Sequence, residues 1–126
     1  MAEHRKFTVI RRKNIPQSRI DMFDDVRVRP EMEEGLCLEQ GILYLIQNKD
    51  KTGCDWARFL CACGCNNEVR VPHETSDKPG WHFKENNKGE ITLGDVDGKV
   101  YGGYSITGGD WCDAHYFVKD NHIVWL

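Results

Sequence analysis

The sequence predicts an all-β fold with at most a minor α part, arranged as a small, metal-stapled β-sandwich or partly open barrel. Three observations support this prediction. Short runs rich in Val, Ile, Leu and aromatic residues alternate with Gly-rich and Asn-rich turns, which is typical of small sandwiches and barrels. The chain is 126 residues long and 40% hydrophobic, enough for one modest core. The stretch "CACGC" places three thiols within five residues, far from a later "WCDAH".

The first 34 residues are predicted to form an N-terminal strand and a polar segment. The strand corresponds to "KFTVI" at 6–10, where Phe7 and Val9 alternate with polar neighbours. The segment that follows is polar and contains two prolines. We expect one short helical turn in it, around residues 18–25.

Residues 35–126 are predicted to form the core of the same single domain. The first three strands are "GILYLIQN", "CDWARFLC" and "EVRVP", at 41–48, 54–61 and 68–72. Three hairpins follow, at 81–93 with Gly89 in the turn, at the Asp-Gly pair within 96–100, and at 114–126.

Composition restricts the setting in which the chain works. The net charge of −3 gives no general attraction to nucleic acid, and no run of about 18 apolar residues is present to span a membrane. The N-terminal residues lack the apolar stretch of an export signal. We therefore expect a cytoplasmic protein with reduced thiols, and we interpret Cys37 and Cys54 as small buried ones.

The remaining cysteines have the arrangement of a zinc site. Zinc in structural sites takes four Cys or His ligands, usually from two separated segments. One segment here offers Cys61, Cys63 and Cys65, and the other offers Cys112 and His115. Thiols this close in one loop pair poorly as disulfides. The sequence therefore predicts a structural Zn²⁺ site.

This ligand set has one member too many. Either all four cysteines bind zinc and His115 is left over, or His115 binds and one thiol is spare. The preferred prediction takes Cys61, Cys63, Cys65 and Cys112 as the metal ligands, which leaves the imidazole available for chemistry.

The chain resembles a small bacterial and phage family of uncharacterised chemistry. Its members are encoded beside multi-ubiquitin-like, E1-like and E2-like proteins in ubiquitin-like conjugation operons. The resemblance covers 35–126 and rests on motifs in the same order: "GILYLIQ", "LCACGC", "KPGWHF", "EITL", "YSITGG", "WCDAHYFV" and "NHIVW". Two positions depart from the family pattern, Tyr104 in place of a proline and Ala114 in place of a frequent serine.

The resemblance implies cytoplasmic work in a bacterial ubiquitin-like conjugation pathway, with an antiphage role as one setting. The implied partners are a ubiquitin-like protein and the E1-like and E2-like proteins of the same operon. Such pathways commonly need a protease, because precursors must be cut to expose a C-terminal glycine. This setting favours a deubiquitinase-like hydrolase.

Ser105 is the candidate nucleophile. It is one of three serines, it lies between two glycine pairs in "GGYSITGG", and it precedes His115 by ten residues. Neighbouring glycines let the backbone approach a substrate and direct N–H groups at an oxyanion. If the two segments form adjacent strands, His115 can act as the base. Asp120 is the preferred acid to orient it, with Asp110 and Asp113 as alternatives.

Other interpretations stay open at this point. Ser105 could be only a turn residue, and His82 is a second candidate base. A metal-assisted hydrolase would use Glu68 or Glu85 as its base. A protein of a different class is a non-catalytic zinc-binding adaptor that holds the E2-like or ubiquitin-like partner. A redox role for the thiols is least favoured, since zinc would silence them.

Overall fold

The computed structural model describes residues 19–30, 36–49, 53–75, 78–96, 99–100, 104–108 and 112–126. The strand expected at 6–10 lies outside these ranges. Within them every strand belongs to one of four sheets and no α-helix is present, so the predicted all-β class is confirmed. No helix among the described residues is long and apolar enough to cross a membrane.

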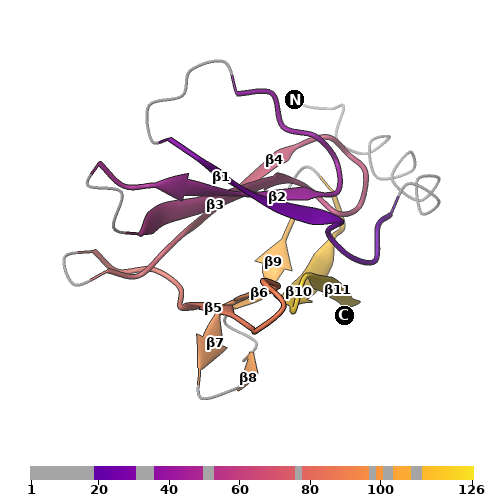
Figure 1. Ribbon diagram of the computed structural model, residues 1–126. Helices are drawn as coiled ribbons and strands as arrows, with labels where there is room; N and C mark the ends of the chain where they lie inside the picture. Colours follow the sequence, from indigo (N-terminus) through magenta and orange to yellow (C-terminus); the bar gives the residue numbers. More distant parts are fainter. Residues whose placement is uncertain are drawn as a thin grey trace.

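The largest sheet has four strands in the order β1-β2-β3-β4. β1 (Asp25–Arg29) is parallel to β2 (Ile42–Gln47), whereas β3 (Cys54–Leu60) and β4 (Glu68–Pro72) continue the sheet antiparallel. Strands β2, β3 and β4 match the predicted positions. The sheet forms the upper layer in Figure 1.

β1 is a strand that the sequence prediction missed. The helical turn expected around 18–25 is absent from the described part of that stretch, and a strand begins at Asp25 instead. The segment "DVRVR" alternates valine with charged residues, the period of a strand, and Val26 packs against the core. Its high charge concealed this pattern.

A second sheet has three strands in the order β11-β10-β9. β10 (His115–Lys119) and β11 (His122–Trp125) form the predicted C-terminal hairpin, and the short strand β9 (Ile106–Thr107) pairs with the other edge of β10. The hairpin turns through Asp120 and Asn121, whose φ angles are 48° and 66°. Two consecutive positive φ values produce a tight turn that Asp and Asn tolerate.

Two small hairpins complete the fold. β5 (Phe83–Glu85) pairs with β6 (Ile91–Leu93), and β7 (Asp95–Val96) pairs with β8 (Lys99–Val100), as the sequence predicts. β6 is tied to the C-terminal hairpin because the Ile91 N–H donates to Asn121 Oδ1 at 2.8 Å and the Asn121 N–H donates to the Ile91 carbonyl at 2.9 Å.

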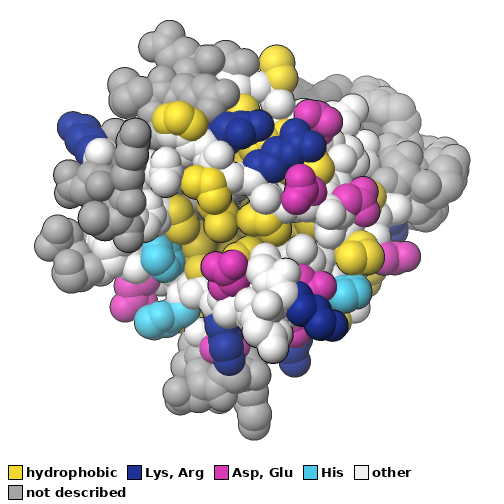
Figure 2. Space-filling model, in the orientation of Figure 1, with side chains coloured by type: hydrophobic (Ala, Val, Ile, Leu, Met, Phe, Trp, Pro, Cys, Tyr) yellow, Lys and Arg dark blue, Asp and Glu magenta, His cyan; other side chains and the backbone are white. Residues whose placement is uncertain are grey.

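The main core lies between the four-stranded sheet and the C-terminal strands, which form two layers in Figure 1. It takes side chains from both layers, including Phe23, Leu43, Phe59, Leu93, Tyr116 and Val118. Figure 2 shows hydrophobic side chains reaching the surface in the middle of this view, with charged side chains around them. This two-layer packing brings the β3–β4 connection against the segment that precedes β10.

Candidate active site and metal centre

The first part of the candidate metal centre is the connection between β3 and β4. The Cys61 N–H donates to the Asn67 carbonyl at 2.8 Å, and the Gly64 N–H donates to the Cys61 carbonyl at 3.1 Å. Gly64 has a φ of 91°, a left-handed conformation that glycine adopts without a steric penalty. These bonds fold residues 61–67 into a compact knuckle that turns its thiols to one side.

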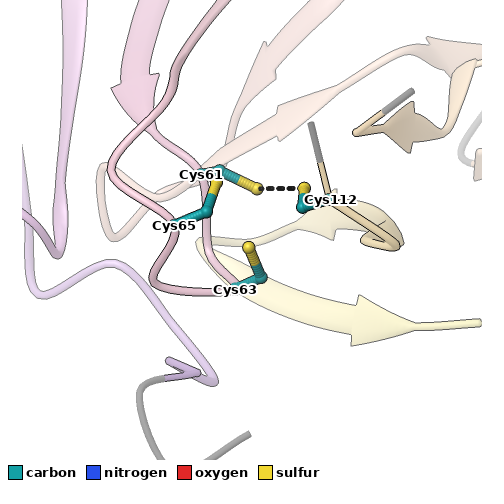
Figure 3. A group of neighbouring side chains, drawn as sticks. All are labelled: Cys61, Cys63, Cys65 and Cys112. Carbon is teal, nitrogen blue, oxygen red and sulfur yellow. Dashed lines mark hydrogen bonds between the residues drawn. The ribbon is translucent and has the colours of Figure 1, made fainter. Parts of the chain in front are cut away.

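Cys112 completes a cluster with Cys61, Cys63 and Cys65. It comes from the segment just before β10, and the four sulfur atoms lie within 4.8 Å of one another (Figure 3). The Sγ atoms of Cys61 and Cys112 are 3.8 Å apart, too far for a disulfide. A tetrahedral Zn²⁺ with Zn–S bonds of about 2.3 Å separates its sulfur ligands by about 3.8 Å. The cluster could therefore hold a metal ion, and its dimensions are consistent with zinc.

The thiols of the cluster differ in their pKa values. Burial raises the pKa of Cys112 to about 11 and also raises the pKa of Cys63, whereas at Cys65 burial is outweighed by hydrogen bonds, led by the one from the Asn67 backbone, which lower the pKa. Thiolates crowded together in a partly buried site are unfavourable unless a positive ion compensates them. His115 does not belong to the cluster, so the four-thiol alternative is the one consistent with the described residues.

Tyr116 is a contact of the cluster that the sequence did not reveal. Its side chain is fully buried, its hydroxyl lies 3.5 Å from Cys61 Sγ, and the same oxygen accepts the Ala62 N–H at 3.2 Å. Burial raises the pKa of Tyr116, so the hydroxyl keeps its proton and can donate to the sulfur. The "HYF" motif contains this residue, but only the fold brings it beside the knuckle.

Ser105 and His115 meet at the edge of the second sheet. Ser105 directly precedes β9, and His115 is the first residue of β10, where it pairs with Thr107. His115 Nε2 lies 2.9 Å from Ser105 Oγ. For Nε2 to accept the hydroxyl proton, the neutral imidazole carries its own proton on Nδ1. The serine and histidine singled out in the sequence are thus within hydrogen-bond distance.

Asp120 is not brought to His115. It lies five residues further along, beyond the end of β10, and a strand rises about 3.3 Å per residue, which separates the two by roughly 16 Å. Its carboxylate accepts from Thr92 Oγ1 at 3.3 Å and from Asn86 Nδ2 at 3.2 Å, and its N–H donates to Thr92 Oγ1 at 2.9 Å. These bonds hold the β10–β11 turn against β6.

The residues around Ser105 are closely packed. The rings of Tyr104 and Trp81 make an edge-to-face contact, with centroids 5.3 Å apart. Gly94 lies directly beneath Tyr104, because a Cβ at Gly94 would clash with Tyr104 Cβ and lie 2.8 Å from its Cγ. Tyr104, the residue before Ser105, is therefore packed tightly between Trp81 and Gly94. The Gly108 N–H donates to the Ala114 carbonyl, so this N–H is engaged within the sheet.

The other sequence candidates have different contacts. His82 Nε2 lies 3.3 Å from Glu74. Glu68 accepts from the Arg58 and Arg70 guanidinium groups, at 2.6 Å each. Cys54 is only partly buried, although burial raises its pKa to about 11. Cys37 is exposed, so its prediction as a buried thiol was wrong.

A hydroxyl paired with an imidazole is the working arrangement of serine hydrolases. Residues 29–126 match the model of the BubE family, described as bacterial ubiquitination-like system serine protease. Because the match covers most of the chain, the protein belongs to this family, as its sequence motifs suggested. No curated protein and no solved structure matches the chain. The family supports a protease rather than a non-catalytic adaptor.

Proposed function

We propose that this serine protease is a zinc-stabilised peptidase that processes or deconjugates a ubiquitin-like protein, with Ser105 as nucleophile and His115 as general base. The 2.9 Å contact between His115 Nε2 and Ser105 Oγ carries the proposal. A general base must lie about 2.6–3.2 Å from the proton-bearing atom, and this pair fulfils that requirement.

The reaction follows from this geometry. Ser105 Oγ attacks the carbonyl carbon of the scissile bond while His115 Nε2 takes its proton. When the tetrahedral intermediate collapses, His115 gives that proton to the leaving amine and an acyl-enzyme remains on Ser105. His115 then takes a proton from water, the resulting hydroxide cleaves the ester, and the proton returns to Ser105. The products are a free carboxylate and a free amine.

Asp113 is the described carboxylate best placed to orient His115. It precedes His115 by two residues, and exposure alternates strictly from Cys112 to Tyr116, so Asp113 and His115 lie on the same exposed face. A carboxylate that accepts from Nδ1–H stabilises the imidazolium formed during attack. Asp113 therefore replaces Asp120 in the proposal.

The metal's role is structural in this proposal. Cys61, Cys63, Cys65 and Cys112 would fill all four positions of a tetrahedral ion, and structural zinc sites are closed in this way. A metal-assisted hydrolase needs an open position and a free base. Glu68 is a poor base, because hydrogen bonding to Arg58 lowers its pKa.

The partners proposed are a ubiquitin-like protein and the E1-like and E2-like proteins of the same system. Membership of a bacterial ubiquitination-like system supports them. The bond cleaved would join the C-terminal residue of the ubiquitin-like protein to an extension or to a target amine.

The test is cleavage of a ubiquitin-like precursor, followed by intact-mass spectrometry. We expect the wild-type protein to release the extension, and a fluorophosphonate probe to label Ser105. Ser105→Ala and His115→Ala should each lower kcat/KM by roughly 10⁴-fold, and the double variant should be no worse, because the two residues act as one unit. Full cleavage by Ser105→Ala would refute the assignment.

A further inference from the structure

The face of the three-stranded sheet that carries His115 also carries exposed apolar side chains. Residues directly opposite in neighbouring strands project from the same face. Leu126 lies opposite His115, because its N–H donates to the His115 carbonyl at 2.9 Å. Val124 pairs with Phe117. Phe117 lies two residues after His115, and Val124 lies two residues before Leu126. We call Phe117, Val124 and Leu126 the apolar strip.

The apolar strip is exposed to solvent although the core lies on the other side of the sheet. Leu126 is 61% exposed and Val124 is 41% exposed, and Phe117 is half-buried. Met22, 39% exposed, pairs with His122 and extends the same face. Three of the five large hydrophobic residues that are exposed in the described ranges therefore share the face that carries His115. Exposed apolar residues gathered in this way mark binding surfaces.

The order of strands shows which part of a substrate would reach the strip. Ser105 lies on the β9 side, His115 on the central strand β10, and the apolar strip continues onto β11. His115 gives its proton to the leaving group, so the leaving group must lie on the imidazole side of the scissile bond. Adjacent strands are about 4.8 Å apart, so Leu126 lies roughly one strand beyond His115 in this direction.

We infer that the apolar strip binds an apolar side chain in the first residues after the scissile bond, and so selects the leaving segment of the substrate. This inference rests on the proposed roles of Ser105 and His115. The acyl part of the substrate would extend the opposite way, past β9. The preferred substrate is thus a ubiquitin-like precursor whose C-terminal extension begins with an apolar residue.

Two fluorogenic peptides test this inference. On the acyl side of the scissile bond both peptides carry the C-terminal sequence of the ubiquitin-like protein. They differ at the first two positions after the bond, which are Leu in one peptide and Glu in the other. We expect wild-type kcat/KM to favour the Leu peptide by about tenfold, the size expected when an apolar side chain is covered on a partly exposed surface. In Val124→Lys/Leu126→Lys the preference should reverse, since two cations replace the apolar contact.

Val28→Lys is the matched control. Val28 is 52% exposed and lies on β1 in the other sheet, so a lysine there should keep the wild-type preference. An unchanged Leu-to-Glu ratio in Val124→Lys/Leu126→Lys would overturn the inference while the proposed function stood. Cleavage by Ser105→Ala would instead refute the proposed role of Ser105 as nucleophile, whatever the Leu-to-Glu ratio. A general loss of folding would lower both rates together and would not reverse the ratio.

Discussion

His115 and Tyr116 are consecutive residues of β10 whose side chains leave the strand on opposite sides. His115 is exposed and meets Ser105, whereas Tyr116 is buried and contacts Cys61. Strand geometry produces this alternation, because successive side chains point to opposite faces. One strand therefore holds the proposed base on one face and supports the metal centre on the other.

The choice between Asp113 and Asp120 can be tested at the residue scale. We expect Asp113→Asn to lower kcat by about tenfold or more, because an amide cannot stabilise the imidazolium as a carboxylate does. Asp120→Asn should leave kcat within about twofold, since Asn tolerates the positive φ of this turn. Steady-state kinetics on one precursor, with matched circular dichroism spectra, measures both. A large loss of kcat in Asp120→Asn alone would reverse the choice.

At the scale of elements, the strands were easier to predict than their pairing. Alternating or continuous apolar runs identified β2, β3, β4 and the C-terminal hairpin, because burial of one face imposes the period of a strand. β1 was missed because it is charged, and its parallel pairing with β2 depends on a distant neighbour. The two residues of β9 are too few to give a period.

The candidate site was predictable to a similar extent. Soft ligands clustered in two motifs identified the four cysteines, and a serine among glycines identified Ser105. Asp120 could not be excluded from the sequence, because the distance from His115 depends on whether β10 continues straight. The contact of Tyr116 with Cys61 and the contact of Tyr104 with Trp81 depend on how the layers pack, which no local pattern specifies.

Glu68 bridges β3 and β4, and its effect should depend on pH. Hydrogen bonds from Arg58 and then Arg70 lower its pKa in the folded state. Its stabilising contribution is therefore present above the ordinary pKa of glutamate and is lost as the pH falls through the lower, folded-state pKa. Glu68→Gln should lower the free energy of unfolding by about 0.5–1 kcal/mol at pH 7, after allowance for solvent screening.

Urea unfolding at pH 7 and pH 3 measures this effect. The difference between wild type and Glu68→Gln should be present at pH 7 and should shrink in acid. A difference of equal size at both values would show that the carboxylate charge has no part in it.

Gly108 joins β9 to the metal centre by close packing. A Cβ at this position would clash with Cys112 Sγ and would lie 2.7 Å from the Cys112 carbonyl oxygen. Gly108→Ala should therefore displace Cys112, lower the metal content of the purified protein and reduce activity. Gly53→Ala is the control, because a Cβ there meets only Asn48 Nδ2, at 3.9 Å. Metal analysis of both variants is the measurement, and full metal occupancy in Gly108→Ala would contradict the expectation.

At the scale of the whole molecule, the four-cysteine cluster connects the two layers. Three of its thiols come from the β3–β4 knuckle of the large sheet, and the fourth lies three residues before His115. If the cluster binds zinc, the free energy of metal binding would therefore also be free energy of folding. Loss of the ion should loosen the contact between the layers as well as the loop that carries Cys112.

Chelation should accordingly destabilise the protein. We expect one zinc per chain, and a melting temperature about 10 °C or more lower after zinc is removed at neutral pH. Zinc should restore it, whereas Mg²⁺, which prefers oxygen ligands, should not. Calorimetry with metal analysis measures both quantities, and an unchanged melting temperature in metal-free protein would contradict a structural role.

The position of Cys112, three residues ahead of His115 on one stretch of chain, has a consequence for the timing of proteolysis. If His115 is the base and the cysteines bind zinc, His115 would reach its place beside Ser105 only after the ion had drawn that stretch onto the knuckle. Nascent and half-folded molecules would therefore be harmless to the conjugates around them. The supply of zinc would decide when a newly made enzyme begins to cut.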